Sequence, residues 1–179
     1  FYLILIFVYL KFVGIEGTLQ IFYFLNKLKR NFLKNNTKTI TITGSYGKTS
    51  TCYILDHILK QKYNVKHVKY NSYFGIRTSL MGINIDEFLN IKTKIRWIYL
   101  FLNLIKNTFI YFPNYDFNLI EVGIDKKEMK KKIDILPNYN LSVLTSVDYV
   151  HSENFNSITE IFDEKIKLIN NLNLNGLGI

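Results

Sequence analysis

The feature that most constrains this chain is a glycine-rich loop between a short strand and an amphipathic helix. Residues 39–43 read Thr-Ile-Thr-Ile-Thr, an alternation of β-branched residues that predicts a strand. Glycines at positions 44 and 47 interrupt it, and from residue 49 to residue 62 the apolar residues recur at helical spacing. Glycines permit a tight turn whose N–H groups converge, and the helix that follows adds the positive end of its dipole. The order strand, glycine loop, helix therefore predicts a site for phosphate groups.

The loop itself reads Thr43-Gly44-Ser45-Tyr46-Gly47-Lys48-Thr49-Ser50. In such a loop the lysine, Lys48, reaches the β and γ phosphates of a nucleoside triphosphate, and the hydroxyl of Thr49 ligates Mg²⁺. The usual pattern has a further glycine at position 42, where this chain has Ile42, so the loop is of a shortened type. We expect residues 44–50 to bind a nucleotide.

The rest of the chain predicts an α/β fold with a mostly parallel sheet, crossover helices and this phosphate loop in its core. Further short strands are predicted at residues 65–70, 117–122 and 141–145, and a helix at about 157–170. Residues 83–112 are amphipathic to very apolar and predict a helix or a helix pair, with an aromatic surplus that faces a membrane or a further domain.

The first residues are unusually apolar. Residues 1–13 carry one charge, Lys11, but thirteen helical residues span only about 20 Å, less than the roughly 30 Å core of a bilayer. Two interpretations stay open for residues 1–32: the end of a membrane segment, with Lys27 to Lys38 as its cytoplasmic flank, or a buried or interfacial helix. We expect an apolar helical segment at residues 1–36 and an ATP-binding domain at residues 37–179.

Composition excludes several classes of protein. With 48% hydrophobic and 21% charged residues the chain can form a core, so wholesale disorder is excluded. Its single cysteine, Cys52, excludes an internal disulfide and a zinc cluster. The net charge of +9 accompanies no helix-turn-helix, zinc or RNA-recognition motif, so we expect no nucleic-acid partner. The chain has no alanine and much lysine, which is typical of an AT-biased coding sequence, and most lysines are read as solvated surface.

Four segments resemble, in the same order, motifs of the Mur ligases, ATP-dependent enzymes that build the peptide stem of peptidoglycan. They are the phosphate loop at 43–51, the asparagine-containing segment 69–76, the strand ending in Glu-x-Gly at 115–123, and the His and Lys segment from 144–155 to 164–165. The resemblance covers about residues 37–170, most of the first half of the family's central ATPase domain. Thr-Gly-Ser in the loop and the 14-residue step from His151 to Lys165 are most similar to the MurF type, which adds D-Ala-D-Ala to UDP-MurNAc-tripeptide.

The resemblance implies a set of site residues. ATP would be bound by Gly44, Ser45, Tyr46, Gly47, Lys48, Thr49, Ser50 and Asn71, and Mg²⁺ by Thr49, Glu121 and His151. Lys48 and Lys165 would be catalytic, with Lys165 carbamylated to an anion that orients Mg²⁺. From the residues alone, Glu121 lies at the carboxyl end of a strand, where open α/β sheets place ligand residues. His151 and Lys165 would otherwise be read as ordinary surface side chains.

Four positions depart from the family pattern: Tyr46, Ser72 and Ser146 each stand where asparagine is usual, and Lys127 replaces a glycine. These departures affect fine nucleotide contacts, whereas the core triphosphate residues are intact.

The resemblance also implies partners. They are a UDP-MurNAc-peptide, D-Ala-D-Ala, and N- and C-terminal domains of the same protein that this chain does not contain. We therefore expect the chain alone not to ligate. The expected location is the cytoplasm, with attachment to the inner face of the membrane as an open alternative. Two other functions stay open: a ligase of the same superfamily acting on a lipid-linked muropeptide or folylpolyglutamate, and a non-catalytic nucleotide-binding protein attached to a membrane.

Overall fold

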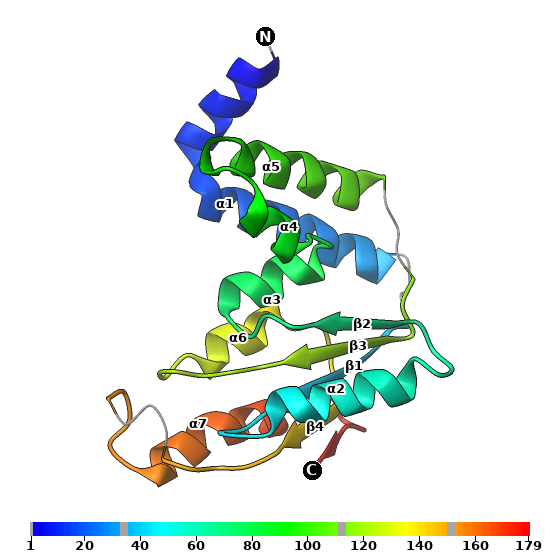
Figure 1. Cartoon of the computed structure of the whole chain (residues 1–179), viewed down its shortest axis with the longest axis vertical. Helices are drawn as coiled ribbons and strands as arrows, with labels where there is room; N and C mark the ends of the chain where they lie inside the picture. Colours follow the sequence, from blue (N-terminus) through cyan, green and yellow to red (C-terminus); the bar gives the residue numbers. More distant parts are fainter. Residues whose placement is uncertain (1, 33–35, 111–113, 150–152) are drawn as a thin grey trace. The chain divides into compact units, whose positions relative to one another are not determined.

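The computed structural model describes residues 2–32, 36–110, 114–149 and 153–179. Its central feature is a sheet of five strands, β1 (Lys38–Thr43), β2 (Val65–Val68), β3 (Phe117–Glu121), β4 (Leu141–Leu144) and β5 (Leu177–Gly178). The strand order is β2-β3-β1-β4-β5, and every neighbouring pair is parallel (Figure 1). This confirms the predicted α/β class with a parallel sheet.

The strand register brings the carboxyl ends of four strands to one edge of the sheet. Ile42 of β1 lies opposite Glu121 of β3, and Thr43 lies opposite Leu144 of β4. On the far side of β3, Val68 lies opposite Ile120. Side chains that follow β1, β2, β3 and β4 are therefore neighbours in space, although the chain between them is long. Ligands of open α/β sheets bind at this edge.

The central strand β1 is covered on both faces. Ile40 and Ile42 belong to a buried apolar cluster with Cys52 of α2 (Lys48–Leu59). The alternate residues Thr39, Thr41 and Thr43 are also fully buried, on the opposite face. Burial on both faces is typical of a strand in a parallel sheet, and it holds the end of β1, where the glycine loop begins, in a packed environment.

Two helices complete this part of the molecule, α6 (Met129–Ile135) and α7 (Ile158–Asn170). They pack on each other, and α7 also packs against β4. Met129, Ile161 and Leu168 are at most 1% exposed in this contact region. The buried hydroxyl of Tyr139 donates a hydrogen bond to the carbonyl of Leu168 at 2.8 Å. These contacts fix α7 beside the sheet.

Residues 1–35 and 78–112 form a second compact unit, separate from residues 36–77 and 113–179. It contains α1 (Tyr2–Phe32), α4 (Ile85–Asn90) and α5 (Thr93–Phe109), while α3 (Tyr73–Leu80) includes residues of both units. Asn26 of α1 donates to the hydroxyl of Thr108 of α5 at 2.6 Å, and the rings of Phe22 and Phe101 meet edge to face at 5.9 Å. Within this unit, α1 and α5 are thus held together by both apolar and polar contacts.

The predicted elements lie close to the observed ones, with differences at their ends. The described part of the apolar stretch 83–112 contains the helix pair α4 and α5. Gly14 has a φ of 70° and interrupts the helical geometry of α1. No helix within the described ranges combines the length and apolar character that a membrane span requires. Helices α3 and α6 and the short strand β5 were not predicted, and the division into residues 1–36 and 37–179 stays a prediction.

Candidate functional site

The loop after β1 has a conformation that only glycine accommodates at two positions. Gly44 has a φ of 152°, and a Cβ there would lie 2.0 Å from the hydroxyl of Thr145. Gly47 has a φ of 80°, in the left-handed region that other residues rarely adopt. The glycines of the motif therefore serve the close approach of the loop to the segment after β4 and the sharp entry into α2.

Several hydrogen bonds tie this loop to the segment 145–148, which follows β4. The N–H groups of Ser45 and Tyr46 donate to the carbonyl and the hydroxyl of Ser146, at 2.9 and 2.8 Å. The hydroxyl of Thr145 donates to the carbonyl of Tyr46 at 2.5 Å, and the N–H of Asp148 donates to the Ser45 hydroxyl at 2.8 Å. The tip of the loop is thus held by the segment after β4, while Tyr46 itself is 60% exposed.

The start of α2 presents uncapped N–H groups beside Lys48. The residue before the helix is Gly47, which has no side chain to accept hydrogen bonds from the first turn. The Nζ of Lys48 lies over the loop and donates to the carbonyls of Gly44 and Ser45 at 2.7 and 3.0 Å. Free helical N–H groups next to a lysine form a positively polarised site suited to an anion.

Glu121 lies at the end of β3, 4% exposed, and joins two of the other predicted residues. The hydroxyl of Thr49 donates to its Oε2 at 2.9 Å, and the side-chain amide of Asn71 donates to its Oε1 at 3.3 Å. Gly123 leaves room for this amide, since a Cβ there would lie 3.0 Å from the Asn71 nitrogen. The structure therefore brings Thr49, Asn71 and Glu121 together at the carboxyl edge of the sheet.

Lys165 of α7 is a buried lysine, 2% exposed, and no hydrogen bond or ion pair joins it to another residue of the described ranges. Burial lowers the pKa of Lys165 to about 8, the nearby charge of Lys48 acts in the same direction, and Asp125 opposes them. The side chain thus lies within electrostatic reach of the glycine loop. A lysine of this kind has an appreciable neutral fraction near neutral pH.

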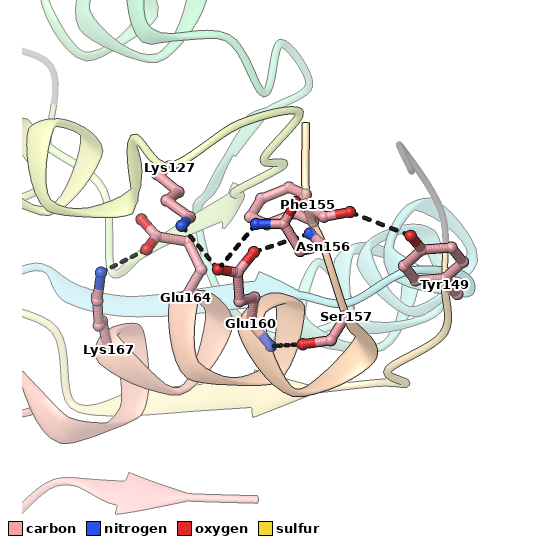
Figure 2. A network of polar contacts seen from close by, with 8 residues as sticks. All are labelled: Lys127, Tyr149, Phe155, Asn156, Ser157, Glu160, Glu164 and Lys167. Atoms are coloured by element: carbon pink, nitrogen blue, oxygen red, sulfur yellow. Dashed lines mark hydrogen bonds and ion pairs between the residues drawn. The ribbon is translucent and has the colours of Figure 1, made fainter. Parts of the chain in front are cut away.

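Figure 2 shows the polar network that holds the start of α7 to the loop between β3 and α6. The Ser157 hydroxyl accepts from the N–H of Glu160 at 3.1 Å, and the Glu160 carboxylate in turn accepts from the N–H of Asn156 at 2.9 Å. Lys127 pairs with the second oxygen of Glu160 at 2.9 Å. Hydrogen bonds from Asn156 and Lys127 lower the pKa of Glu160.

One turn further along α7, Glu164 accepts from the N–H of Met129, at the start of α6, at 2.8 Å, and it also pairs with Lys167. Helix α7, which carries Lys165, is thereby fixed to the segment that follows Glu121.

The remaining predicted residues have different outcomes. His151 lies outside the described residues, so its role as a metal ligand stays a prediction. Ser50 is exposed on the first turn of α2. Within the described parts of the chain, no group of three or more His, Cys, Asp or Glu residues is placed to hold a metal ion. Phosphate oxygens and water are further oxygen ligands that Mg²⁺ accepts, and they would be available beside Thr49 and Glu121 when a nucleotide is bound.

Sequence reasoning missed the residues that support the site. Ser146 stood out only as a departure from the family pattern, yet it accepts two hydrogen bonds from the glycine loop. Lys127 stood out for the same reason, and it pairs with Glu160. The usable signal for Ser146 was its position directly after a strand, since residues that follow parallel strands meet at one edge of the sheet.

Comparison with known proteins gives a family and a set of similar folds. A family model, Mur ligase middle domain, matches residues 42–179. A search of curated protein sequences finds no match. Among solved structures, MurF from Acinetobacter baumannii superposes with a TM-score of 0.60 at 14% identity, over 90% of this chain and 29% of that protein. MurF ligase from Thermotoga maritima in complex with ADP gives a TM-score of 0.56 at 22% identity, over 86% of this chain and 30% of that protein.

These likenesses to solved structures establish the fold, and the family model covers most of the chain. The chain spans about three tenths of the length of the MurF proteins that it resembles. The match begins at Ile42, inside β1, and includes the glycine loop, Glu121 and Lys165. The chain therefore belongs to the Mur ligase family, through its middle domain.

Proposed function

We propose that this chain supplies the ATP-binding part of a peptide ligase of peptidoglycan precursor synthesis, of the MurF type. The observation that carries the proposal is the hydrogen bond of Thr49, which directly follows the glycine loop, with Glu121. It joins a hydroxyl at the start of α2 to a carboxylate at the end of β3, in a chain whose family model is the Mur ligase middle domain. The similarity to MurF structures supports the subtype.

The residues present fit a nucleoside triphosphate with Mg²⁺. The first-turn N–H groups of α2 and the Lys48 ammonium provide donors for phosphate oxygens. The Thr49 hydroxyl and the Glu121 carboxylate are hard oxygen ligands, which Mg²⁺ prefers. When bound, the metal would neutralise charge on the transferring phosphoryl group. Lys48 would release the carbonyls of Gly44 and Ser45 in order to reach the phosphates.

The proposed reaction is amide formation through an acyl phosphate. A substrate carboxylate oxygen attacks the γ-phosphorus of ATP, the bond to the β-γ bridging oxygen breaks, and ADP leaves. The amine of an amino acid or dipeptide then attacks the acyl carbon, inorganic phosphate leaves, and the amine gives up a proton. Charge builds on the transferring group, so Lys48 would act electrostatically.

Lys165 would contribute as a carbamate. A neutral amine reacts with CO₂ and releases one proton, so the lowered pKa of Lys165 favours the reaction at neutral pH. The product is an anion, which could orient Mg²⁺ where an ammonium could not. A carbonyl signal from ¹³C-bicarbonate that is present in the wild-type protein and absent in Lys165→Met would support this role, and its absence from both would contradict it.

The proposed substrates are a UDP-MurNAc-peptide and D-Ala-D-Ala, in the cytoplasm. Binding both would require the additional domains of a longer protein, because this chain corresponds to 29% of the length of MurF from A. baumannii. We therefore expect no ligation by the 179-residue chain alone. Robust ADP release by the purified chain with a UDP-MurNAc-peptide would refute this expectation.

The first test is nucleotide binding by the 179-residue chain. Calorimetric titration with ATP and Mg²⁺ should show binding that Lys48→Ala weakens at least about tenfold, as expected for loss of a charged contact worth more than about 1.4 kcal/mol. Lys60→Ala is the matched control: Lys60 lies just beyond the other end of α2 and forms an exposed pair with Asp56 at 2.7 Å. Equal effects of the two substitutions, or no binding by the wild type, would contradict the proposal.

A further inference from the structure

Lys132, in the middle of α6, is a buried lysine whose ammonium has three acceptors. Its side chain is 3% exposed, and lysine is rarely buried to this extent unless it is paired. The Nζ donates to the carbonyl of Gly123 at 2.5 Å and to the carbonyl of Asn71 at 3.1 Å, and it pairs with Glu128 at 3.0 Å. An ammonium has three donors, so all of them are used.

Two of these acceptors follow neighbouring strands. Asn71 lies after the end of β2 and Gly123 lies after the end of β3, and the two strands run parallel, side by side. Lys132 therefore bridges the backbone of the two strand ends at the edge where the candidate site lies.

The bridge continues into the site through Asn71. The amide of Asn71 donates to Oε1 of Glu121 at 3.3 Å, and the same amide packs against the bare Cα of Gly123. Lys132 thus donates to the backbone carbonyl of Asn71. It also donates to the carbonyl of Gly123, the residue against which the Asn71 side chain packs. Thr49 occupies the other oxygen of Glu121, so the orientation of the carboxylate depends on Asn71 and Thr49 together.

We propose that Lys132 is a positioning residue that sets Glu121 for its cation by fixing Asn71. This deepens the proposed function and rests on it as far as Glu121 binds Mg²⁺. Without the Lys132 ammonium, two backbone carbonyls lose this partner, and the Asn71 amide no longer has a fixed position beside the carboxylate. Outer groups that orient a metal ligand typically change metal affinity about 10- to 100-fold when they are removed.

Nothing in the local sequence points to this role. Lys132 is the third of three consecutive lysines, Lys130, Lys131 and Lys132, in a run that reads as solvated surface. Lys130 and Lys131 are indeed exposed, whereas Lys132 points into the molecule because of its place on α6. The neighbour Lys131 therefore provides a matched control for the same chemical change without the contacts.

The first experiment measures ATP binding by the 179-residue chain over a series of Mg²⁺ concentrations. Lys132→Met, which keeps the volume and removes the donors, should raise the half-maximal Mg²⁺ concentration about 10- to 100-fold. It should leave Mg²⁺-free ATP binding unchanged, because the glycine loop is intact, and Lys131→Met should change neither. In an Asn71→Ala background, Lys132→Met should have little further effect, since the two residues act in series.

A purely structural role would lower stability and leave the Mg²⁺ requirement unchanged, and that result would overturn the proposal. Additive effects of Lys132→Met and Asn71→Ala would overturn it as well.

A second experiment does not depend on the nucleotide, so it separates failure of this inference from failure of the proposed function. The side-chain amide pair of Asn71 in the ¹H–¹⁵N spectrum is identified by its loss in Asn71→Ala. Lys132→Met should shift or broaden this pair, and Lys131→Met should not. An unmoved pair overturns the inference, whether or not ATP binds.

If Lys132→Met does not fold, the wild-type chain still provides a test. The ammonium of Lys132 should exchange with water more slowly than those of exposed lysines, because three acceptors hold it. Exchange as fast as that of the exposed lysines would overturn the inference.

Discussion

Replacing Lys165 by methionine should stabilise the protein at neutral pH. Burial, with a smaller effect of the Lys48 charge, lowers the pKa of Lys165 from 10.5 to about 8, so keeping the side chain charged in the folded state costs up to about 3 kcal/mol, and less where solvent screens the charge. Below pH 8 the folded chain bears this full cost. Between pH 8 and 10.5 the unfolded chain holds the proton that the folded chain has lost, so wild-type stability rises with pH in this range. Methionine has a similar volume and no charge, and avoids the cost at every pH.

The assay is urea unfolding followed by far-UV circular dichroism in CO₂-depleted buffer, at several pH values from about 7 to 10. Fluorescence is less suitable, because the single tryptophan, Trp97, lies in the unit of residues 1–35 and 78–112, whereas Lys165 lies in the unit of residues 36–77 and 113–179. The expected free energy of unfolding is up to about 3 kcal/mol higher for Lys165→Met at pH 7, and the difference should narrow as pH rises. Lys167→Met is the control on the same helix, and it should lower stability by up to about 1 kcal/mol, since Lys167 pairs with Glu164. A Lys165→Met protein less stable than wild type at pH 7, or a difference that does not change with pH, would refute the reasoning.

Two further substitutions test the supports of the site. The Gly44→Ala protein should be about 1–3 kcal/mol less stable than wild type in urea unfolding, because the added Cβ would lie 2.0 Å from the Thr145 hydroxyl. A Gly44→Ala protein as stable as wild type would show that the loop does not approach Thr145 this closely. Ser157→Ala should lose about 1 kcal/mol, because the hydroxyl caps α7. Thr159→Ala, which removes an exposed hydroxyl from the first turn of the same helix, serves as its control in the same assay, and equal losses would argue against the cap.

The strands β1 and β3 were predicted well because they are buried on both faces. The alternation at residues 39–43 and the apolar run of residues 117–122 predict strands that the structure ends within one residue of the expected bounds. Helix α6 was missed because four of its seven residues are charged, and its buried face consists of Met129, Ile135 and the stem of Lys132. Short helices with few apolar positions carry little periodic signal.

The sequence predicted the chemical residues of the site but not the residues that support them. The residue types at Lys48, Thr49 and Glu121 carry their chemistry in the sequence, because glycine loops and strand-end carboxylates have recognisable positions. What supports them depends on which parts of the chain meet in space. The hydrogen bonds from the loop to Ser146 and from Lys132 to Asn71 join residues about 60 to 100 positions apart. A pattern of neighbouring residues in the sequence does not indicate contacts over such separations.

The strand order has a consequence for the chain as it is synthesised. Strands β1 and β2 are made first, but they are not neighbours, since β3 lies between them. Until residues 117–121 have left the ribosome, both early strands expose unpaired edges and apolar side chains, which favour association with other chains. A nascent chain stopped before β3 should therefore need a chaperone, and one extended past β4, which completes the pairing of β1, should not.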